Sequence, residues 1–307
     1  MTQAPGTSLL ERIGNTPLIR LDKLTAHLPG VHILGKAEWA NPGGSAKDRS
    51  AAAIVADAKQ RGLLTGAKRL LDASSGNAGV SYAMLGAALG FPVTLCLPED
   101  ISSGQKQLLA AYGADVVYTP ADAGIDGAIF KARELVGNDP AKYCYVDQFS
   151  NDVNWQAHYQ STGSEIWQQT DGRITHFVAS LGSSGTFIGT TRKLKQFNSK
   201  LQSVALQPDL PDHGLHGMKH ISTTMLPAIY SPYLADRHLT VSTAVARAMV
   251  TRLASVEGLV VGISSAAAVA ACVQIAEEEY IANAEGDIET VIVAILCDGG
   301  ERYLSKE

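Results

Sequence analysis

The chain has 307 residues, of which 46% are hydrophobic, 18% are charged and 6% are aromatic. This length and composition are typical of a globular protein with about two domains. The formal net charge of -5 provides no basic surface for a polyanion, so we expect no nucleic-acid partner. No apolar stretch approaches the ~20 residues of a membrane span, and residues 1–14 lack the layout of a secretory signal. We therefore expect no membrane association and a cytoplasmic location.

The cysteines and histidines show no spacing that is typical of a metal or redox site. Cys96, Cys144, Cys272 and Cys297 are far apart, mostly lie within apolar runs and form no CxxC pair, which predicts reduced core residues. The histidines form no HxH or HExxH pattern, so no metal site is predicted. We keep His158, His216 and His220 as candidate neighbours of a site.

Short apolar runs alternate with helical patterns along almost the whole chain. Many of these runs are rich in Val, Ile and Leu without polar alternation, as in strands that are covered on both faces. The succession of strand and helix predicts right-handed βαβ units and mostly parallel sheets. Because a single sheet would be very wide, we expect an α/β fold with two sheets in two domains. The predicted strands are residues 33–38, 69–73, 92–97, 115–119, 143–146, 175–179, 203–206 and 290–297.

The predicted helices indicate where a ligand would bind. They are residues 50–61, 80–89, 105–112, 124–135 and 243–256, with a further helical run at 266–276. Residues 208–222, with two prolines, two glycines and three histidines, are the least periodic segment and predict a loop. In open parallel sheets, ligands bind beyond the carboxyl ends of the strands, where loops lead into helices. The glycine- and serine-rich loops at those points are therefore the candidate sites.

The segment NPGGSAKDR, residues 41–49, directly follows a predicted strand. Ser45 with Asp48 three residues later is a capping-box pattern, which predicts a helix that starts at Ala46 and carries Lys47 in its first turn. The positive end of a helix dipole disfavours an ammonium there, and a neutral amine can form a Schiff base with an aldehyde. The alternative is a solvated surface lysine. The glycine-rich approach favours the reactive lysine because it admits a bulky group close to the backbone.

Three further loops are rich in glycine and hydroxyl side chains. SSGNAG, residues 74–79, combines hydroxyls, backbone N–H groups and a helix start, which form a receptor for a carboxylate or phosphate; a plain helix cap is the alternative. GSSGT, residues 182–186, can cradle a phosphate and is neither a Walker loop nor a GxGxxG fingerprint. GISS, residues 262–265, is by itself typical of a serine cap. No GxSxG elbow or spaced acidic pair indicates a hydrolase.

Taken in chain order, these motifs resemble the cysteine synthase family of pyridoxal-phosphate enzymes, which have fold type II like the tryptophan synthase β-like proteins. The matching segments are residues 13–18 (IGNTPL), 41–49, 74–79, 147–149 (DQF), 162–167 (TGSEIW), 182–186, 262–265 and 297–305 (CDGGERYLS). Residues 165–180, EIWQQTDGRITHFVAS, look closest to the B-type isozyme, O-acetylserine sulfhydrylase B. The resemblance implies a smaller mobile substrate-binding domain at 34–149 and a larger cofactor-binding domain at 1–33 plus 150–307. The cofactor, pyridoxal 5'-phosphate, would lie in the cleft between them.

The resemblance also implies which residues hold the cofactor. Lys47 would form the Schiff base and later move the α-proton of the substrate. Asn77 would hydrogen-bond the phenolic oxygen of the cofactor, and Ser264 would face its pyridine nitrogen. The cofactor phosphate would lie in the loop formed by Gly182, Ser183, Ser184, Gly185 and Thr186.

A second set of residues is implied to hold the substrate. Ser74, Ser75 and Gln148 would bind its carboxylate together with backbone N–H groups of Gly76, Asn77 and Ala78. Lys219, followed by His220 and Ile221, stands where the B-type enzyme shows an arginine pair and a tryptophan. The paired forks that arginine offers to anions are missing here, but Lys219 can serve as a point charge for an anionic donor.

A serine beside the ring nitrogen carries mechanistic meaning. Its hydroxyl cannot protonate the ring as an aspartate partner does, so the ring is expected to be a weaker electron sink. This favours elimination of a good leaving group from Cβ over transamination or racemisation. The implied reaction is β-replacement on O-acetylserine or O-phosphoserine by sulfide or a related sulfur donor, which forms cysteine through an α-aminoacrylate intermediate.

Two alternatives stay open on the sequence alone. The first is a related β-replacement or elimination enzyme with another nucleophile, such as a diaminopropionate or cyanoalanine synthase or a serine dehydratase, and residues 212–222 should decide between these. The second is a catalytically silent relative that binds a partner such as serine acetyltransferase. The presence of Lys47, Asn77, Gln148 and Ser264 together argues against the silent relative. A homodimer is expected from the family.

Overall fold

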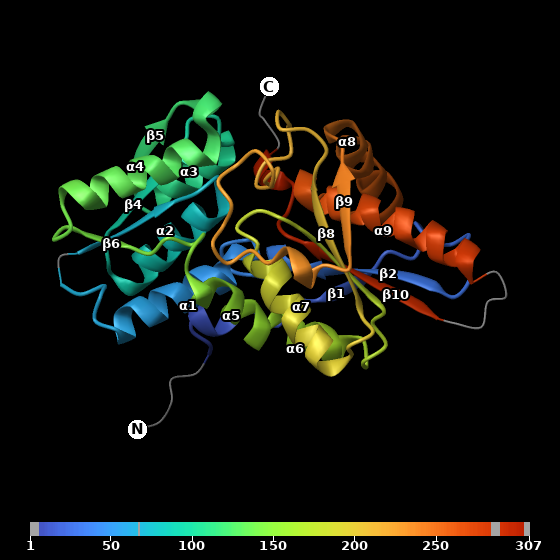
Figure 1. The fold of residues 1–307 in the computed structure, drawn as a ribbon. Helices are drawn as coiled ribbons and strands as arrows, with labels where there is room; N and C mark the ends of the chain where they lie inside the picture. The colour runs from blue at the N-terminus through green and yellow to red at the C-terminus, as the bar shows by residue number, and fades with distance from the viewer. Residues whose placement is uncertain (1–5, 67, 284–288, 304–307) are drawn as a thin grey trace.

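The computed structural model describes residues 6–66, 68–283 and 289–303, which fold around two separate sheets (Figure 1). One sheet has the strand order β1-β2-β10-β7-β8-β9 and the other the order β5-β4-β3-β6. Neighbouring strands are parallel except for the pair β1 and β2. The α/β fold with mostly parallel sheets is thus confirmed. The strands are β1 (Leu18–Arg20), β2 (Val31–Ala37), β3 (Arg69–Ala73), β4 (Val93–Pro98), β5 (Asp115–Thr119), β6 (Tyr143–Tyr145), β7 (His176–Ser180), β8 (Gln202–Pro208), β9 (Arg237–Val241) and β10 (Thr290–Leu296).

Helices connect the strands and cover the sheets (Figure 1). The α-helices are α1 (Lys47–Gln60), α2 (Asn77–Leu89), α3 (Ser103–Ala111), α4 (Gly124–Asn138), α5 (Asp152–Gln160), α6 (Thr162–Gln169), α7 (Gly185–Phe197), α8 (Thr243–Arg252) and α9 (Ile263–Ala282). Short 3-10 turns are η1 (Leu10–Arg12), η2 (Glu38–Ala40), η3 (Ala121–Ala123), η4 (Pro232–Leu234) and η6 (Glu301–Tyr303). The predicted 243–256 helix changes at Leu253 into a π-helical turn, η5 (Leu253–Glu257).

Each sheet is buried on both faces, which explains its apolar strands. In the six-stranded sheet, α8 and α9 cover one face through a core that includes Val204 and Ile292. The other face packs on α6 and α7 around Phe177 and Phe187. In the four-stranded sheet, α1, α2 and α3 share a core with β3 and β4, and α4 covers the opposite face. These cores hold the carboxyl ends of the parallel strands in fixed positions.

The predicted strands all exist, and the bounds of β3 and β5 are the predicted ones. Two strands were missed. β1 has only three residues, which is too short for a periodic pattern, and β9 alternates partly buried and exposed side chains at the edge of its sheet. The predicted loop at 208–222 is irregular after β8 ends at Pro208.

The division into domains at residue 34 and residue 149 stays a prediction. The proposed boundary at residue 34 falls inside β2, which pairs with β10 along Val31–Ala37. The four-stranded sheet lies wholly within 34–149. The loops that follow β3 and β6 in this sheet, and β7 and β10 in the other, lead to one cavity.

Candidate functional site

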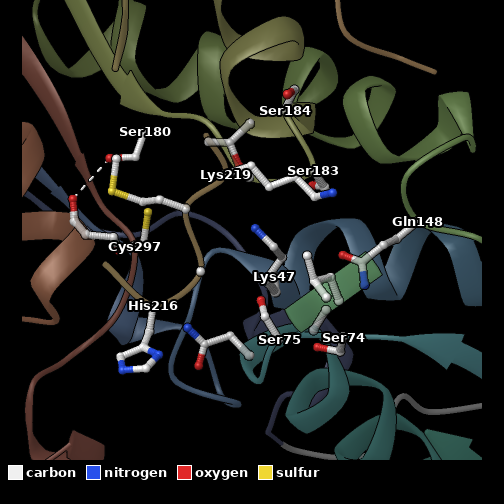
Figure 2. A pocket seen from close by; sticks show the side chains of 18 of the residues that line it. Lys47, Ser74, Ser75, Gln148, Ser180, Ser183, Ser184, His216, Lys219 and Cys297 are labelled. Carbon is white, nitrogen blue, oxygen red and sulfur yellow. Dashed lines mark hydrogen bonds between the residues drawn. The ribbon is translucent and has the colours of Figure 1, made fainter. Parts of the chain in front are cut away.

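The cavity collects residues from both sheets, and Figure 2 shows many of their side chains. Most of the residues predicted for a site line it, namely Lys47, Ser74, Ser75, Asn77, Ala78, Gln148, Gly182, Ser183, Ser184, Thr186, Lys219 and Ser264. Gly76 and Gly185 lie in the same loops without lining the cavity. Its wall also includes Gln105, Cys297 and Tyr303, which were not predicted as site residues. Motifs spread over most of the chain therefore meet in one place.

Lys47 is the first residue of α1 and therefore lies in the first turn, as predicted. The helix begins one residue later than predicted, because Ala46 is its N-cap, and the capping box does not form. Asp48 turns instead toward the glycine loop and α2, and its carboxylate accepts from Gly43 N at 2.5 Å and from Ser81 Oγ of α2 at 2.5 Å. Burial raises the pKa of Asp48 to about 6. Asp48 thus fixes the loop that leads to Lys47.

The side chain of Lys47 is half-buried and points into the cavity (Figure 2). Within the residues that the structure describes, its Nζ has neither a hydrogen bond nor an ion pair. Ser45 Oγ accepts only the backbone N–H of Lys47, at 3.3 Å. An amine without a competing partner is free to react with a group that enters the cavity.

A buried charge network anchors the start of α1. Arg49, two residues after Lys47, donates from Nε to Glu38 Oε2 at 2.7 Å and from Nη1 to Glu165 Oε1 at 2.7 Å. Lys36 Nζ lies 2.7 Å from the second oxygen of Glu165. Burial alone raises the pKa of Glu165, but its bonds with Arg49 and Lys36 outweigh burial and lower that pKa to about 2. The network was missed, although Arg49 and Glu165 lie in two of the recognised motifs.

The Ser74–Gly79 loop is held by its own hydroxyl. Ser74 Oγ accepts from Gly76 N at 3.0 Å and from Gly79 N at 2.9 Å, which closes the turn at the start of α2. Gly76 has φ +137, and a Cβ there would lie 2.3 Å from the Gln105 amide, so the position requires glycine. Ser75 is exposed and lines the cavity. The loop thus directs Ser75 and the start of α2 at a ligand, while Ser74 supports the turn.

Gln148 joins this loop from the end of β6. Its Nε2 donates to the Ala73 carbonyl at 2.7 Å, and its backbone N–H donates to Asp72 at 3.4 Å. Asp72 also accepts from Ala73 N at 2.9 Å. Asp72 is fully buried, which raises its pKa to about 8. This carboxyl group, which was not predicted as a site residue, connects Gln148 to the strand that leads into the Ser74 loop.

Asn77, the first residue of α2, is surrounded by side chains of the C-terminal signature. Its Nδ2 donates to Asp298 at 2.6 Å, and its Oδ1 accepts from Arg302 Nη1 at 2.8 Å and from Gln105 Nε2 at 3.1 Å. The Tyr303 hydroxyl lies 3.5 Å from Nδ2, so one amide hydrogen is only weakly used. Leu304 and Ser305 of the signature lie outside the described residues. The contact of Asn77 with the cofactor's phenolic oxygen stays a prediction.

The Gly182–Thr186 loop leads from β7 into α7 and has the properties of a phosphate site. Ser184 is the N-cap of α7 with φ +71, its side chain makes no cap bond, and its buried Oγ has no partner among the described residues. Ser183 Oγ accepts from Asn154 at 3.1 Å, and Thr186 Oγ1 lies 3.2 Å from His158 Nε2. An unpartnered hydroxyl at an uncapped helix start fits a phosphate group.

Of the three histidines kept from the sequence, two lie at the site. His158 is buried beside Thr186, and burial lowers its pKa well below the usual value. The imidazole is therefore neutral, and its Nδ1 shares a hydrogen bond with Thr162 at 2.9 Å. His216 lines the cavity, whereas His220 bonds to Thr223 and is not part of the wall.

Ser264, in the first turn of α9, also lines the cavity. Its carbonyl accepts from Ser180 Oγ at 3.1 Å, the bond drawn in Figure 2. Cys297, which follows β10, lies close by and is a free thiol like Cys96, Cys144 and Cys272. Burial raises the pKa of Cys297 to about 11, so it is a neutral thiol. Ser264 and Cys297 thus present uncharged polar groups.

Lys219 comes from the irregular segment between β8 and β9. Its Nζ donates to Asp126 Oδ1 at 2.8 Å and to the Met225 carbonyl at 2.9 Å. The residue is 3% exposed but borders the cavity. Its role as a point charge for an anionic donor stays a prediction, and it would require the ammonium to leave Asp126.

The residues that the structure describes are 6–66, 68–283 and 289–303. They contain no group of three or more His, Cys, Asp or Glu side chains that could hold a metal ion. None of their helices is both long enough and apolar enough to cross a membrane.

Comparison with known proteins gives consistent results. The family described as pyridoxal-phosphate dependent enzyme matches residues 9–298. A cysteine synthase from Aquifex aeolicus is 46% identical over 300 residues, which cover 97% of this chain and 90% of the relative. A cysteine synthase B from Pseudomonas aeruginosa is 39% identical over 298 residues, which cover 97% of this chain and 96% of the relative.

Two solved structures are similar over nearly the whole chain. An O-acetylserine sulfhydrylase-type cysteine synthase from Entamoeba histolytica has a TM-score of 0.89 and 32% identity, with 100% of this chain and 92% of the other covered. An O-ureido-L-serine synthase has the same TM-score of 0.89 and 32% identity, with 99% of this chain and 95% of the other covered. The chain therefore belongs to the pyridoxal-phosphate dependent enzyme family, in which it is an enzyme of the cysteine synthase type with pyridoxal 5'-phosphate as its cofactor.

Proposed function

We propose that this enzyme forms cysteine by β-replacement on O-acetylserine or O-phosphoserine with sulfide or a related sulfur donor. One observation carries the proposal: Lys47 Nζ, which has no partner among the described residues, lies in the same cavity as two loops rich in hydroxyl groups, at Ser74–Ala78 and at Gly182–Thr186. An amino-acid substrate needs a site for its carboxylate, and the cofactor needs a separate site for its phosphate. The two loops meet both needs around one lysine.

The residues that would hold the cofactor follow from this arrangement. Lys47 would bind it covalently through Nζ, the Gly182–Thr186 loop would hold its phosphate, and Ser264 would face its ring nitrogen. When bound, the cofactor withdraws electrons and stabilises negative charge at the α-carbon of the substrate. Ser264 offers a hydroxyl without full charge, which supports loss of a leaving group from Cβ rather than transamination.

The remaining steps belong to the protein's own residues. The substrate carboxylate would be held by Ser74, Ser75 and Gln148 together with the N–H groups at the start of α2, which orients the Cα–H bond toward Lys47. Lys47 Nζ would then accept the α-proton and return it after the sulfur atom has bonded to Cβ. Asn77 would hold the cofactor's phenolic oxygen through its weakly used amide hydrogen.

The similarity of fold does not identify which nucleophile this enzyme uses. The two solved structures match this chain equally well, although one is named for O-ureido-L-serine synthesis and the other for cysteine synthesis. Sulfide is the preferred proposal because both curated relatives are named cysteine synthases. We further propose a cytoplasmic homodimer. Binding of serine acetyltransferase is a separate proposal that mixing the two purified proteins and measuring the mass of the complex would test.

The experiment that tests the proposal is a visible spectrum of the purified holoenzyme before and after addition of O-acetylserine or O-phosphoserine. The account predicts that at least one donor shifts the cofactor band, that sulfide restores it, and that cysteine accumulates in step with turnover. If both donors leave the spectrum unchanged, the proposal is wrong. If a donor shifts the band and only a nucleophile without sulfur restores it, the proposed β-replacement is supported and the proposed sulfur donor is wrong.

A further inference from the structure

The ammonium of Lys219 is paired with the carboxylate of Asp126, which lies on a helix that covers the other sheet. Lys219 belongs to the segment between β8 and β9 of the six-stranded sheet, and Asp126 belongs to α4, which covers the four-stranded sheet. Lys219 Nζ donates to Asp126 Oδ1 at 2.8 Å, while Met225 N donates to the second oxygen at 2.6 Å. Both oxygens of Asp126 are therefore engaged by a single segment. We call this arrangement the Asp126–Lys219 clasp.

The clasp matters because of the charges that surround the cavity. Among the described residues that line it, the lysines are Lys47 and Lys219, and there is no arginine, aspartate or glutamate. Lys47 is committed to the cofactor. Lys219 is thus the remaining fixed cation that could meet a charged leaving group, but its charge is cancelled by Asp126 at close range.

The two candidate donor amino acids differ in the charge of the leaving group. An acetyl ester is uncharged, whereas a phosphate monoester carries between one and two negative charges near neutral pH. A phosphate that entered the cavity would stay unpaired or would draw Lys219 away from Asp126. In the first case the phosphate is buried without a cation. In the second case the largely covered carboxylate of Asp126 loses its cation. An acetyl ester incurs neither cost.

We propose that Asp126, by neutralising Lys219, makes this enzyme select serine donors with an uncharged leaving group, O-acetylserine rather than O-phosphoserine. The inference rests on the proposed function and names its substrate class. Asp126 does not line the cavity, so it acts through Lys219 as a specificity-determining residue. Lys219 also lies 5.1 Å from the centre of the Phe149 ring, a contact that keeps the ammonium at the cavity wall when Asp126 is changed.

The test is a cycle of three variants: Asp126→Asn, Lys219→Met and the double variant. For each we would measure kcat/KM for O-acetylserine and O-phosphoserine, and the concentration of each donor that half-saturates the shift of the cofactor band without sulfide. The ratio of phosphoserine to acetylserine is the quantity of interest. A change in loop mobility would alter both donors alike, whereas a change in charge alters their ratio.

Wild-type enzyme is expected to prefer O-acetylserine. Asp126→Asn should raise the phosphoserine-to-acetylserine ratio at least about tenfold, because it frees one unit of positive charge, and added salt should reduce this gain. Lys219→Met should lower the ratio, because it leaves the carboxylate of Asp126 without its counter-charge. The double variant removes both charges of the pair. It should return the ratio to within about twofold of wild type, because the effects of two residues in contact are not additive.

Three results would overturn the inference while leaving the proposed function intact: a wild-type preference for O-phosphoserine, an unchanged ratio in Asp126→Asn, or a gain that survives in the double variant. If Asp126→Asn does not fold, the wild-type preference and the direction of the Lys219→Met change still decide. Absence of turnover with either donor in the wild type contradicts the proposed function itself and, with it, the inference.

Discussion

Glu165 on α6 and Arg49 on α1 form a two-point ion pair inside the protein, with Nη1–Oε1 at 2.7 Å and Nη2–Oε2 at 2.8 Å. They are 116 residues apart in the chain. The pair fixes the first turn of α1 relative to the six-stranded sheet, and Lys47 lies two residues before Arg49. The position of Lys47 thus depends on a charge pair in which Lys47 itself takes no part.

Glu165→Gln should therefore destabilise the folded protein. Loss of one partner of a buried ion pair typically costs ~3–5 kcal/mol, because the remaining charges stay buried. Lys36 would lose its carboxylate partner, and Arg49 would keep only its pair with Glu38. Chemical denaturation of the two proteins measures the difference. Glu134→Gln is the matched control, since its pair with Lys131 is exposed and should contribute less than about 1 kcal/mol. Equal losses in the two variants would contradict the assignment.

The same pair predicts a pH dependence. The folded pKa of Glu165 is about 2, below the ordinary value of 4.5. Its ionised form therefore stabilises the folded chain above pH 4.5, and this contribution is lost as the pH falls toward 2. The free energy of unfolding should drop more steeply between pH 5 and pH 3 in wild type than in Glu165→Gln. Parallel curves for the two proteins would show that the pair does not carry this linkage.

Asp72 should contribute a pH dependence of stability with the opposite sign to that of Glu165. Burial raises its folded pKa to about 8 from an ordinary value of 3.8, so between these limits the folded state holds a proton that the unfolded state has released. Stability from this group is full below pH 3.8 and falls as the pH rises toward 8. Asp72→Asn keeps an acceptor for Ala73 N and removes the titration. The variant should gain stability relative to wild type as the pH rises from 5 to 8, measured by denaturant unfolding. A constant difference over that range would contradict it.

A variant of Ser184 tests the proposal that the Gly182–Thr186 loop holds the cofactor phosphate. Its buried Oγ has no partner in the described residues and lies at the start of α7. A hydrogen bond to a charged group contributes about 1.5–3 kcal/mol, so Ser184→Gly should weaken cofactor binding at least about tenfold. Glycine also suits the φ of +71, so the protein without cofactor should keep its stability. Equilibrium dialysis measures the affinity. Unchanged affinity would place the phosphate elsewhere.

Lys47→Ala should abolish covalent binding of the cofactor and lower kcat by about a thousandfold or more. Lys59→Ala on the same helix is the matched control, because that lysine is exposed and stacks on Phe91 outside the cavity. The measurement is turnover of O-acetylserine with sulfide, after thermal unfolding has shown that both variants are folded. Normal turnover of Lys47→Ala would refute its role.

Sequence patterns over a few residues predicted the strands and loops whose structure depends mainly on neighbouring residues. β3 and β5 had the predicted bounds because each is a short apolar run ended by turn residues. The loops after β3 and β7 were predicted as candidate sites because glycine and serine there precede helices. β9 was missed because its partly buried, alternating pattern depends on its place at the sheet edge.

Contacts between distant residues could not be predicted from local patterns. The capping box at Ser45 failed because the Asp48 carboxylate bonds instead to Gly43 N and to Ser81 Oγ, and Ser81, 33 residues away, comes close only in the folded chain. In the same way, nothing in the sequence pairs Lys219 with Asp126, 93 residues away. The sequence therefore predicted which loops line the cavity, whereas the ion pairs around it depend on tertiary structure.

The most direct test of the central claim locates the cofactor on the chain. The holoenzyme would be reduced with borohydride to fix the cofactor to its lysine, digested, and analysed by mass spectrometry. The structure predicts one adduct, on the peptide that contains Lys47, and none in Lys47→Ala. An adduct on another lysine, such as Lys219, or bound cofactor without any adduct would contradict the assignment of Lys47.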